Sequence, residues 1–536
     1  MMDAIFTPPT ACARQIDWRF LLPQPEGHPF EHLALIGGST EIEASILDLG
    51  VAQRVSRRLR HGDRADALIV LAGATESLDT AARHLDHNGV LYWEVDRRVP
   101  GQFGMTPARA LRRVKQHGLN PAAAYWVKPG FPARQMYLPL QAGRAFRWYL
   151  DTLYRTPTCR RRMVGTALRA LAAAGRGLAA FAPCYAITAV RGTTRPPALI
   201  ERACMEGLSI SHANQPVLLA YGETEWNRIV LLLFDPNASV PTAAIKLPRT
   251  PVFNQQVEWE HDILRELSSN LAPPIRRSIP TSALFRWNGL AVSAETCVTG
   301  SSLSSRAGPA ANDALEDLRL TVAWLASFHR ETTIDTVPAR EWLTQRLVNG
   351  MCADYAATFG LTDAETRLFA TLSQRLDVAG PGLLPIVWQH GDFGPPNVYL
   401  DRSHVSVIDW ETARRGPALA DLLYFVTDWS AAAAGRASDT ERLEHFESLF
   451  CAGSPADALT RAVHGEIAEY MRRVGLPASL FGFLLVYTFL EKALERARRL
   501  AKLGRPDAAR RAGNRFVAYV GVLAQYAHRL FGEERN

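Results

Sequence analysis

The segment VWQHGDFGPPNVYLDRSHVSVIDWE, residues 387–411, contains three polar side chains whose types and spacing suit phosphoryl transfer. Asp392 lies five positions before Asn397, among glycines and prolines that prevent regular structure. The apolar runs on either side of the turn DRSH predict a β-hairpin, which would bring Asp409 to the end where Asp392 and Asn397 lie. One carboxylate could then take the proton of a hydroxyl, while an amide oxygen and a second carboxylate hold Mg²⁺.

Each of these residues also has a simpler interpretation, which the sequence leaves open. HGD could be an ordinary turn, and Asp409 could cap the end of a strand. The order Asp, four residues, Asn, and then an aspartate that ends a strand is nevertheless the spacing of a kinase catalytic loop. The three residues together therefore favour chemistry over simple turns and caps.

Lys246 is a second candidate, because lysine is rare in this chain. Of 60 basic residues only five are lysines, at positions 115, 128, 246, 492 and 502. Lys246 ends the predicted strand AAIK, and a compact ammonium group suits a phosphate clamp. The alternative is an exposed lysine at the end of a strand.

Residues 387–425 resemble the aminoglycoside phosphotransferase and choline kinase family, which has a protein-kinase-like fold. The similarity rests on His390-Gly391-Asp392, Asn397 and Ile408-Asp409-Trp410-Glu411, followed by Gly416-Pro417 and Ala420-Asp421-Leu422. The resemblance implies that Asp392 is the catalytic base, that Asn397 and Asp409 bind magnesium, and that His390 orients the loop. Gly394 and Pro396 depart from the family, many of whose members have histidine and glycine there.

The same resemblance extends over about residues 205–536 and implies a nucleotide site in the amino-terminal lobe. Lys246 would position the phosphates, braced by Glu260 on a predicted helix over 257–267, where Glu258 and Glu266 are rival partners. The segment YGETEWN, residues 221–227, would cover the nucleotide. Glu295 and Cys297 would belong to the hinge whose backbone meets the adenine.

The first 195 residues predict a different architecture. Apolar runs at 32–36, 66–71, 90–95, 122–127 and 182–190 alternate with predicted helices, which is typical of an α/β doubly wound, Rossmann-like domain with a mostly parallel sheet. The turn Gly37-Gly38 follows the first strand, and overall this part resembles a class I S-adenosylmethionine-dependent methyltransferase domain. Its glycine motif is reduced, so we interpret it as a degenerate domain that scaffolds, with an active methyltransferase as the alternative.

The sequence thus predicts a multidomain protein. A Rossmann-like domain over residues 1–195 and a linker over 196–204 precede a kinase-like lobe over 205–297 and a helical lobe over 298–536. The expected cofactors are ATP and Mg²⁺, with S-adenosylmethionine as an alternative for the first domain. The expected reaction phosphorylates a hydroxyl of a small molecule such as a sugar or aminocyclitol. A nucleotide-binding pseudoenzyme and a bifunctional methyltransferase-kinase are the alternatives.

Composition excludes several other classes. With 47% hydrophobic and 21% charged residues the chain should fold, and a net charge of +7 is too small for its length to predict nucleic-acid binding. Seven scattered cysteines without CxxC spacing argue against disulfide frameworks and zinc sites. The first residues lack a signal-peptide pattern, and the longest apolar stretch, 480–490, is too short to span a membrane. We therefore expect a cytoplasmic protein without membrane or nucleic-acid partners.

Overall fold

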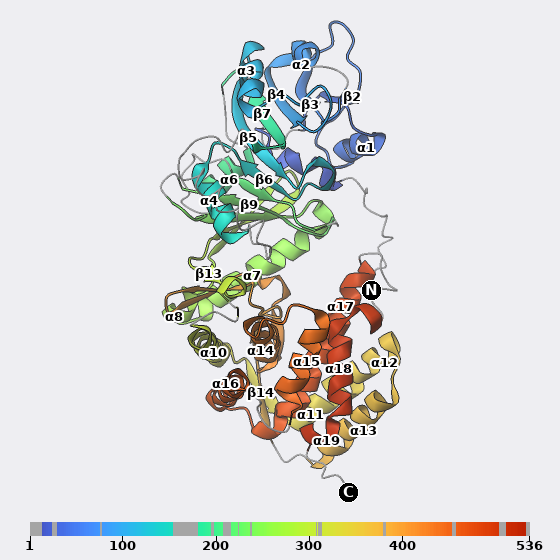
Figure 1. The fold of residues 1–536 in the computed structure, drawn as a ribbon, viewed down its shortest axis with the longest axis vertical. Coiled ribbons are helices and arrows are strands. Elements are labelled where there is room, and N and C mark those ends of the chain that lie inside the picture. Colours follow the sequence, from blue (N-terminus) through green and yellow to red (C-terminus); the bar gives the residue numbers. More distant parts are fainter. Residues whose placement is uncertain are drawn as a thin grey trace. The chain divides into compact units, whose positions relative to one another are not determined.

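The structure is a computed structural model that describes residues 13–23, 29–74, 78–153, 181–193, 198–206, 216–222, 225–235, 238–306, 308, 313–378, 382–452, 457–502 and 511–531. It divides into two compact units (Figure 1). Unit 1 comprises Met1–Asp262 and Thr281–Cys297, and unit 2 comprises Ile263–Pro280 and Val298–Asn536. Each unit is described separately below.

Unit 1 is built on one sheet of 12 strands, ordered β11-β12-β10-β9-β8-β6-β5-β7-β4-β3-β1-β2. Most of its strands are rich in β-branched and other apolar side chains and are buried on both faces, as expected for a sheet covered on both sides. The strands are β1 (Leu33–Ile36), β2 (Val55–Ser56), β3 (Ala65–Val70), β4 (Leu85–Asp96), β5 (Asn120–Lys128), β6 (Met136–Pro139), β7 (Cys184–Val190), β8 (Val217–Leu219), β9 (Ile229–Leu233), β10 (Ala243–Leu247), β11 (Ser282–Trp287) and β12 (Leu290–Thr296).

The sheet is mixed rather than mostly parallel. Strands β2, β1, β3 and β4 are parallel, whereas β7 lies antiparallel between β4 and β5, and all later pairings are antiparallel. The predicted strands of the first 195 residues are present, with helices α1 (Thr40–Asp48), α2 (Leu78–Ala81) and α3 (Pro107–Gln116) between them. The predicted Rossmann-like domain is nevertheless not confirmed, because the alternation of strands and helices does not fix the order and direction in which strands pair.

The sheet continues without a break from the amino-terminal part into the predicted kinase-like lobe. Strand β6 pairs with β8, with Met136 opposite Leu219 and Tyr137 opposite Leu218. The predicted linker, 196–204, overlaps helix α6 (Ala198–Glu206), whose Leu199 is buried in the same apolar core as strand β10. The apolar side chains of this segment explain why it is helical and buried. The predicted domain limits themselves stay a prediction.

Unit 2 consists mainly of helices around two small sheets. One sheet contains β13 (Ser301–Ser302), β16 (Val398–Asp401) and β17 (His404–Val407), and the other contains β14 (Asp335–Pro338), β15 (Leu383–Gln389) and β18 (Arg414–Pro417). The predicted hairpin is confirmed, since β16 and β17 pair with Val398 opposite Val407. The longer helices are α10 (Ala314–Glu331), α13 (Asp363–Val378), α14 (Ala420–Ala433), α15 (Asp439–Phe450), α16 (Ala458–Val474), α17 (Phe481–Lys502) and α18 (Arg515–Gln525).

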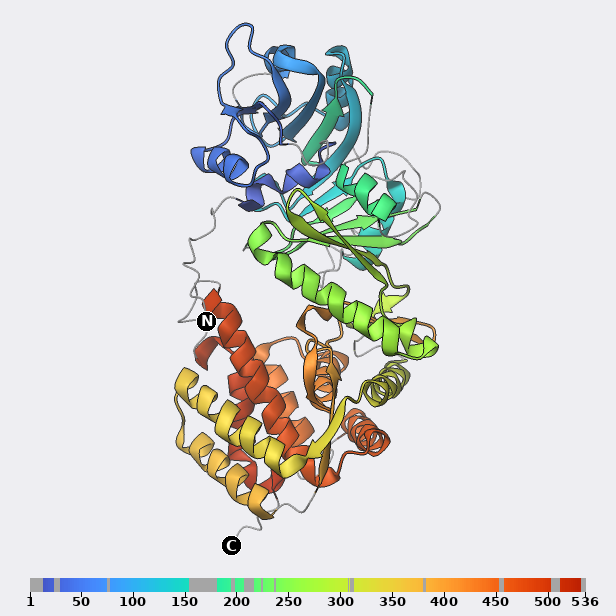
Figure 2. The same ribbon diagram turned by 180° about the vertical axis from the view of Figure 1, so that it is seen from behind.

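The helices of unit 2 share one apolar core. Helix α13 packs against α18, and α12 (Ala353–Phe359) packs against α17, seen in Figure 2 as yellow helices beside red ones. Among the described residues, no single helix has the length and apolar composition to cross a membrane, whereas the bent pair Ala458–Val474 and Ala478–Ala501 meets that test jointly.

Candidate functional site

The loop between β15 and β16 carries Asp392 and is fixed by its backbone. The N–H groups of His390 and Gly391 donate to the two carboxylate oxygens of Asp421 at 2.6 and 3.0 Å. Asp421 lies in the first turn of α14, where a carboxylate is also favoured by the helix dipole. Gly391 has φ +80°, and a side chain there would collide with the carbonyl oxygen of Thr412. The loop therefore needs glycine at this position.

His390 is fully buried and holds the loop through both ring nitrogens. Its Nδ1 accepts the backbone N–H of Asp392 at 3.2 Å, so its Nε2 carries the proton and donates to the carbonyl of Ile408 at 2.9 Å. The ring also contacts Trp410, with ring centroids 4.7 Å apart. Both nitrogens are thus used within the protein, which fits the orienting role that the resemblance implies.

Asn397 lies beside Asp392, as the spacing predicts. Its Nδ2 donates to the carbonyl oxygen of Asp392 at 3.0 Å and to Oδ2 of the same residue at 3.2 Å. Since both partners are acceptors, the amide must point its nitrogen toward them and its Oδ1 away. The carbonyl of Asn397 accepts the N–H of Ile408 at 3.0 Å. Asp409 is the residue after Ile408, so this hydrogen bond ties its backbone to Asn397. Asp409 adopts a left-handed backbone conformation, with φ 70° and ψ 62°.

Two further side chains at this loop had no role in the sequence-based prediction. Lys492 on α17 is 8% exposed, donates from Nζ to the carbonyl of Gly391, and pairs with Glu495 at 2.9 Å. Tyr424 on α14 lies under the same ammonium group, which is 4.7 Å from its ring centroid. The scarcity of lysine was the only sequence signal for Lys492.

The Tyr424 hydroxyl, which lies beside Asp392, is protonated. Burial raises the pKa of the Tyr424 hydroxyl, and the negative charge of Asp392, to which the hydroxyl is hydrogen-bonded, raises it further. A neutral phenol donates one hydrogen bond, so Tyr424 helps to orient the carboxylate of Asp392. The sequence offered no signal for this residue beyond its place two residues after the Ala-Asp-Leu motif.

The second group of predicted residues lies in unit 1. Lys246, in β10, is almost fully buried between two carboxylates, Glu260 of α7 (Asn254–Asn270) at 2.8 Å and Glu295 of β12 at 2.9 Å. Arg228 also pairs with Glu260. The structure thus brings Lys246, Glu260 and Glu295 together, and it selects Glu260 over its rivals as the partner on α7. Glu295 contributes its side chain to Lys246 rather than only a hinge backbone.

The two carboxylates on Lys246 differ in charge state. Burial alone would raise the pKa of Glu260, but the charges of Arg228 and Lys246 and their hydrogen bonds lower it to about 2. Burial raises the pKa of Glu295 to about 7, because Lys246 compensates only part of its desolvation and the charge of Glu260 opposes it. Glu260 is therefore the permanent anionic partner of the lysine.

A chain of hydroxyl groups continues from Glu295. Ser293 donates to Oε1 of Glu295 at 3.2 Å, its hydroxyl lies 2.9 Å from that of Ser282, and Ser282 lies 2.9 Å from Nδ1 of His261. These bonds orient the Glu295 carboxylate toward Lys246. They come from neighbouring strands and α7, so no local sequence pattern could reveal them.

Cys297 lies just beyond the end of β12. Its backbone N–H donates to the carbonyl of Thr242 at 3.1 Å, and burial raises the pKa of its thiol to about 12. Its side chain packs in the same apolar cluster as Ala244 of β10. The N–H of Cys297 is thus committed to the protein, and the predicted hinge role would depend on other backbone atoms of residues 295–298.

The predicted turn Gly37-Gly38 is closed by packing rather than open to a ligand. Gly38 has φ +80°, and a Cβ there would lie 2.7 Å from a methyl group of Leu71, while one at Gly37 would lie 3.3 Å from Ala74. Nearby, Glu94 is buried and accepts hydrogen bonds from Arg134 at 2.9 Å and from the backbone of Ala72 at 3.1 Å. The carboxyl ends of these parallel strands are therefore occupied by the protein's own groups.

The residues at the hairpin are compatible with Mg²⁺. Among the described parts of the chain, no group of three or more His, Cys, Asp and Glu side chains is arranged to hold a metal ion. Mg²⁺, however, is usually held by one or two protein oxygens together with waters and substrate phosphates. The Oδ1 of Asn397, turned away from Asp392, and the carboxylate of Asp409 supply two oxygens of that type.

Part of the chain is similar to known proteins. Residues 227–451 match the phosphotransferase enzyme family. Similar solved structures include macrolide 2'-phosphotransferase MphH from Brachybacterium faecium, at 17% identity over 58% of this chain and 95% of that chain, with a TM-score of 0.37. A microcompartment-associated aminopropanol kinase is similar at 16% identity over 63% of this chain and 99% of that chain, with a TM-score of 0.38.

No curated protein matches the chain. The family match includes every residue of the loop and the hairpin described above, together with Lys246, Glu260 and Glu295. The part of the chain that holds these side chains, residues 227–451, is thus the part that matches the phosphotransferase enzyme family.

Proposed function

We propose that the protein transfers the γ-phosphoryl group of ATP to a hydroxyl of a small molecule, with Mg²⁺ as cofactor. The observation that carries this proposal is the family match over residues 227–451, which contains Asp392 hydrogen-bonded to Asn397 at the end of the β16–β17 hairpin. In such a reaction the protein mainly positions the reactants and stabilises charge. A sugar or an aminocyclitol is the proposed class of acceptor.

Asp392 is the proposed base. Its carboxylate receives the proton of the acceptor hydroxyl as the oxygen attacks the phosphorus atom. The hydrogen bonds from Asn397 and Tyr424 hold the carboxylate in one orientation. Lys492 and Asp421 fix the backbone on the amino-terminal side of Asp392.

Asn397 and Asp409 are the proposed magnesium ligands. When bound, Mg²⁺ would neutralise charge on the phosphate oxygens. In unit 1, Lys246 supplies the ammonium group for the phosphates, and the ionised Glu260 holds that group in place.

The decisive experiment is the substitution Asp392→Asn, assayed by ADP release against a panel of sugars, aminocyclitols, amino alcohols and macrolides. Wild type should show acceptor-stimulated ADP release with at least one compound, and the variant should lose about 10²–10⁴-fold in kcat, the usual contribution of a general base. Asp401→Asn, an exposed aspartate of the same hairpin, is the control and should retain activity. Equal acceptor-stimulated rates for Asp392→Asn and wild type would refute the assignment.

A cytoplasmic location is also proposed. All five cysteines among the described residues are free thiols, which supports a reducing compartment.

We propose a scaffolding role for the amino-terminal part instead of methyl transfer. The close packing of Gly38 against Leu71 supports this proposal, because a nucleotide-like cofactor would need that approach to the backbone. Calorimetric titration of the full chain with S-adenosylmethionine should show no binding, and a saturable binding signal would argue for the bifunctional alternative.

A further inference from the structure

A buried ion pair links the first helical segment of the chain to the strand that carries Lys246. Arg249 follows β10 by two residues, and its side chain is fully buried. Its Nε lies 3.1 and 3.0 Å from the two carboxylate oxygens of Asp17, and a terminal nitrogen lies 3.0 Å from one of them. Asp17 belongs to the 3-10 segment η1 (Ala13–Leu21) and is also fully buried. Residues more than 230 positions apart thus neutralise each other.

The remaining donors of Arg249 hold both ends of the loop between β8 and β9. One terminal nitrogen donates to the carbonyl of Asn227 at 2.8 Å, and the other donates to the carbonyl of Ala220 at 3.2 Å. Residues 221–227 lie between these two carbonyls and form the segment predicted to cover the nucleotide. The planar guanidinium group has five donors in fixed directions, which suits it to bind a carboxylate and two separate carbonyls at once.

Two residues of this loop, Gly222 and Glu225, show further constraints. Gly222 has φ +88°, and a side chain there would collide with that of Asn227. Burial raises the pKa of Glu225, while the charges of Arg249 and Arg19 lower it, so the carboxylate of this loop residue lies within the field of both arginines. The loop is therefore coupled to η1 by charge as well as by hydrogen bonds.

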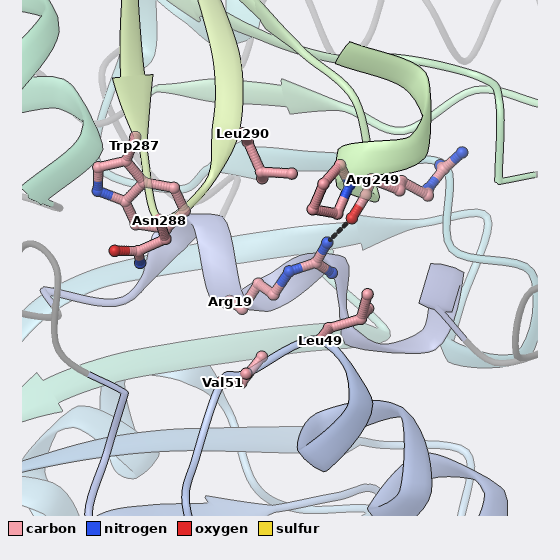
Figure 3. A pocket seen from close by; sticks show the side chains of 9 residues that line it. Arg19, Leu49, Val51, Arg249, Trp287, Asn288 and Leu290 are labelled. Carbon is pink, nitrogen blue, oxygen red and sulfur yellow. Dashed lines mark hydrogen bonds between the residues drawn. The ribbon is translucent and has the colours of Figure 1, made fainter.

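Arg19 fixes the backbone of Arg249 from the same segment. It donates to the carbonyl of Arg249 at 2.6 Å, the contact drawn in Figure 3, and to the carbonyl of Ile16 at 3.2 Å. Beside it lies a cavity of about 40 Å³, lined also by Val51, Trp287 and Leu290. Such a volume suits only a few waters, so we assign it no ligand.

We propose that Asp17 and Arg249 are positioning residues for nucleotide binding, through which the amino-terminal segment holds both ends of the loop between β8 and β9, at Ala220 and Asn227, and the end of β10 in their binding conformation. The inference rests on the proposed function, because it assumes that this part of unit 1 binds ATP. Without Asp17, the guanidinium of Arg249 would be a buried charge lacking its counterion, and it would move toward water and release the two carbonyls. The loop would then have to be ordered at each binding event, which weakens binding.

The test measures the affinity of the full-length protein for Mg–ATP by isothermal titration calorimetry. Asp17→Asn removes the counterion, whereas Arg249→Lys keeps a charge for Asp17 but cannot reach both carbonyls. Each variant should raise the dissociation constant for Mg–ATP by about 10-fold or more. Hydrogen exchange at residues 225–228 should become faster in both variants.

Glu94→Gln is the matched control. Glu94 and Arg134 form a similarly buried pair in the same sheet, 2.9 Å apart. Arg134 also donates to the carbonyl of Gln15 in η1, so this control tests whether loss of any buried pair next to η1 has the same effect. The control should lower thermal stability as the test variants do, and yet bind Mg–ATP within about 2-fold of wild type.

Affinities of Asp17→Asn and Arg249→Lys that equal wild type, or that fall no further than in Glu94→Gln, would overturn the inference. Wild-type protein that fails to bind Mg–ATP would instead contradict the proposed function, and the inference with it. Because Arg249→Lys retains a buried charge pair, it keeps the test valid where Asp17→Asn fails to fold.

Discussion

Lys246 has two carboxylate partners that behave differently, although both are glutamates buried within one sheet and its helix. Glu260 pairs with two cations, Arg228 and Lys246, and remains ionised. Glu295 pairs with Lys246, which it shares with Glu260, and its pKa is raised. A like charge close by favours protonation of one member of a pair. At the scale of single residues, the site therefore consists of one fixed anion and one anion that titrates near neutrality.

This difference predicts a pH-dependent stability for Glu295→Gln. The folded-state pKa of about 7 lies above the 4.5 of an ordinary glutamate, so the folded protein binds more protons between these values. The free energy of unfolding of wild type should therefore fall relative to the variant, by about 2 kcal/mol between pH 5 and pH 8. Urea denaturation at both pH values measures this change.

Glu258→Gln is the control for that measurement. Glu258 lies on the same helix and pairs with Arg286 near the surface. The free energy of unfolding of Glu258→Gln should change between the two pH values as that of wild type does. A constant difference between wild type and Glu295→Gln from pH 5 to pH 8 would show that Glu295 titrates as an ordinary glutamate.

Lys492 supports a prediction about the rate of transfer. Its ammonium group holds the carbonyl of Gly391, the residue before Asp392. Lys492→Met retains most of the apolar length of the side chain but cannot donate, so Asp392 should lose its alignment and kcat should fall about 10- to 100-fold, with little change in the KM for ATP. Arg498→Met, an exposed position of the same helix, should leave kcat unchanged. An equal kcat for both variants would contradict the anchoring role.

At the scale of elements, helix α14 and the catalytic loop are held together by Asp421. Its carboxylate accepts the N–H groups of His390 and Gly391 and lies 3.5 Å from Nε2 of His329 on α10. Burial alone would raise the pKa of Asp421, but the nearby imidazole of His329 and the hydrogen bond from the backbone N–H of His390 lower it to about 2. One side chain thus joins two helices to the loop that carries Asp392.

The low pKa of Asp421 predicts a contribution to stability that acid removes. The folded-state value of about 2 lies below the ordinary 3.8, so this contribution is present above about pH 4 and is lost as the pH falls through 2. The advantage of wild type over Asp421→Asn should shrink by about 2 kcal/mol between pH 6 and pH 2. Chemical denaturation at both values measures it, with the exposed Asp439→Asn as control. An advantage independent of pH would exclude this mechanism.

At the scale of the molecule, the continuous sheet makes the amino-terminal part a structural component of the phosphotransferase. Strand β8 pairs with β6, and the face of β10 and β12 opposite Lys246 is buried in a core shared with η1 and α6. Removing residues 1–204 would expose the edge of β8, uncover this apolar face and leave Arg249 without Asp17.

The fragment 205–536 should therefore aggregate, or unfold about 10 °C below the full chain, since loss of a buried counterion alone costs about 3–5 kcal/mol. Size-exclusion chromatography and thermal denaturation test this. Co-expression of residues 1–204 should restore a soluble complex. A monomeric fragment with the melting temperature of the full chain would show that the kinase-like part folds independently.

Contacts within one loop, hairpin or strand could be predicted from the sequence. The spacing of Asp392, Asn397 and Asp409 predicts their meeting at the end of a hairpin, and the structure contains that hairpin and the Asp392–Asn397 bond. The pairing of Lys246 with Glu260 also follows from a strand and the helix after it. Such contacts are local, so the chain's own geometry brings the groups together.

Contacts between distant segments depend on the tertiary fold and could not be predicted from the sequence. Glu295 turns its side chain to Lys246 because β12 pairs with β10, with Ala244 opposite Glu295. Asp17 reaches Arg249, and Lys492 reaches Gly391, across 232 and 101 residues. The order of strands in the sheet and the packing of helices α14 and α17 set these contacts, and neither leaves a periodic pattern in the sequence.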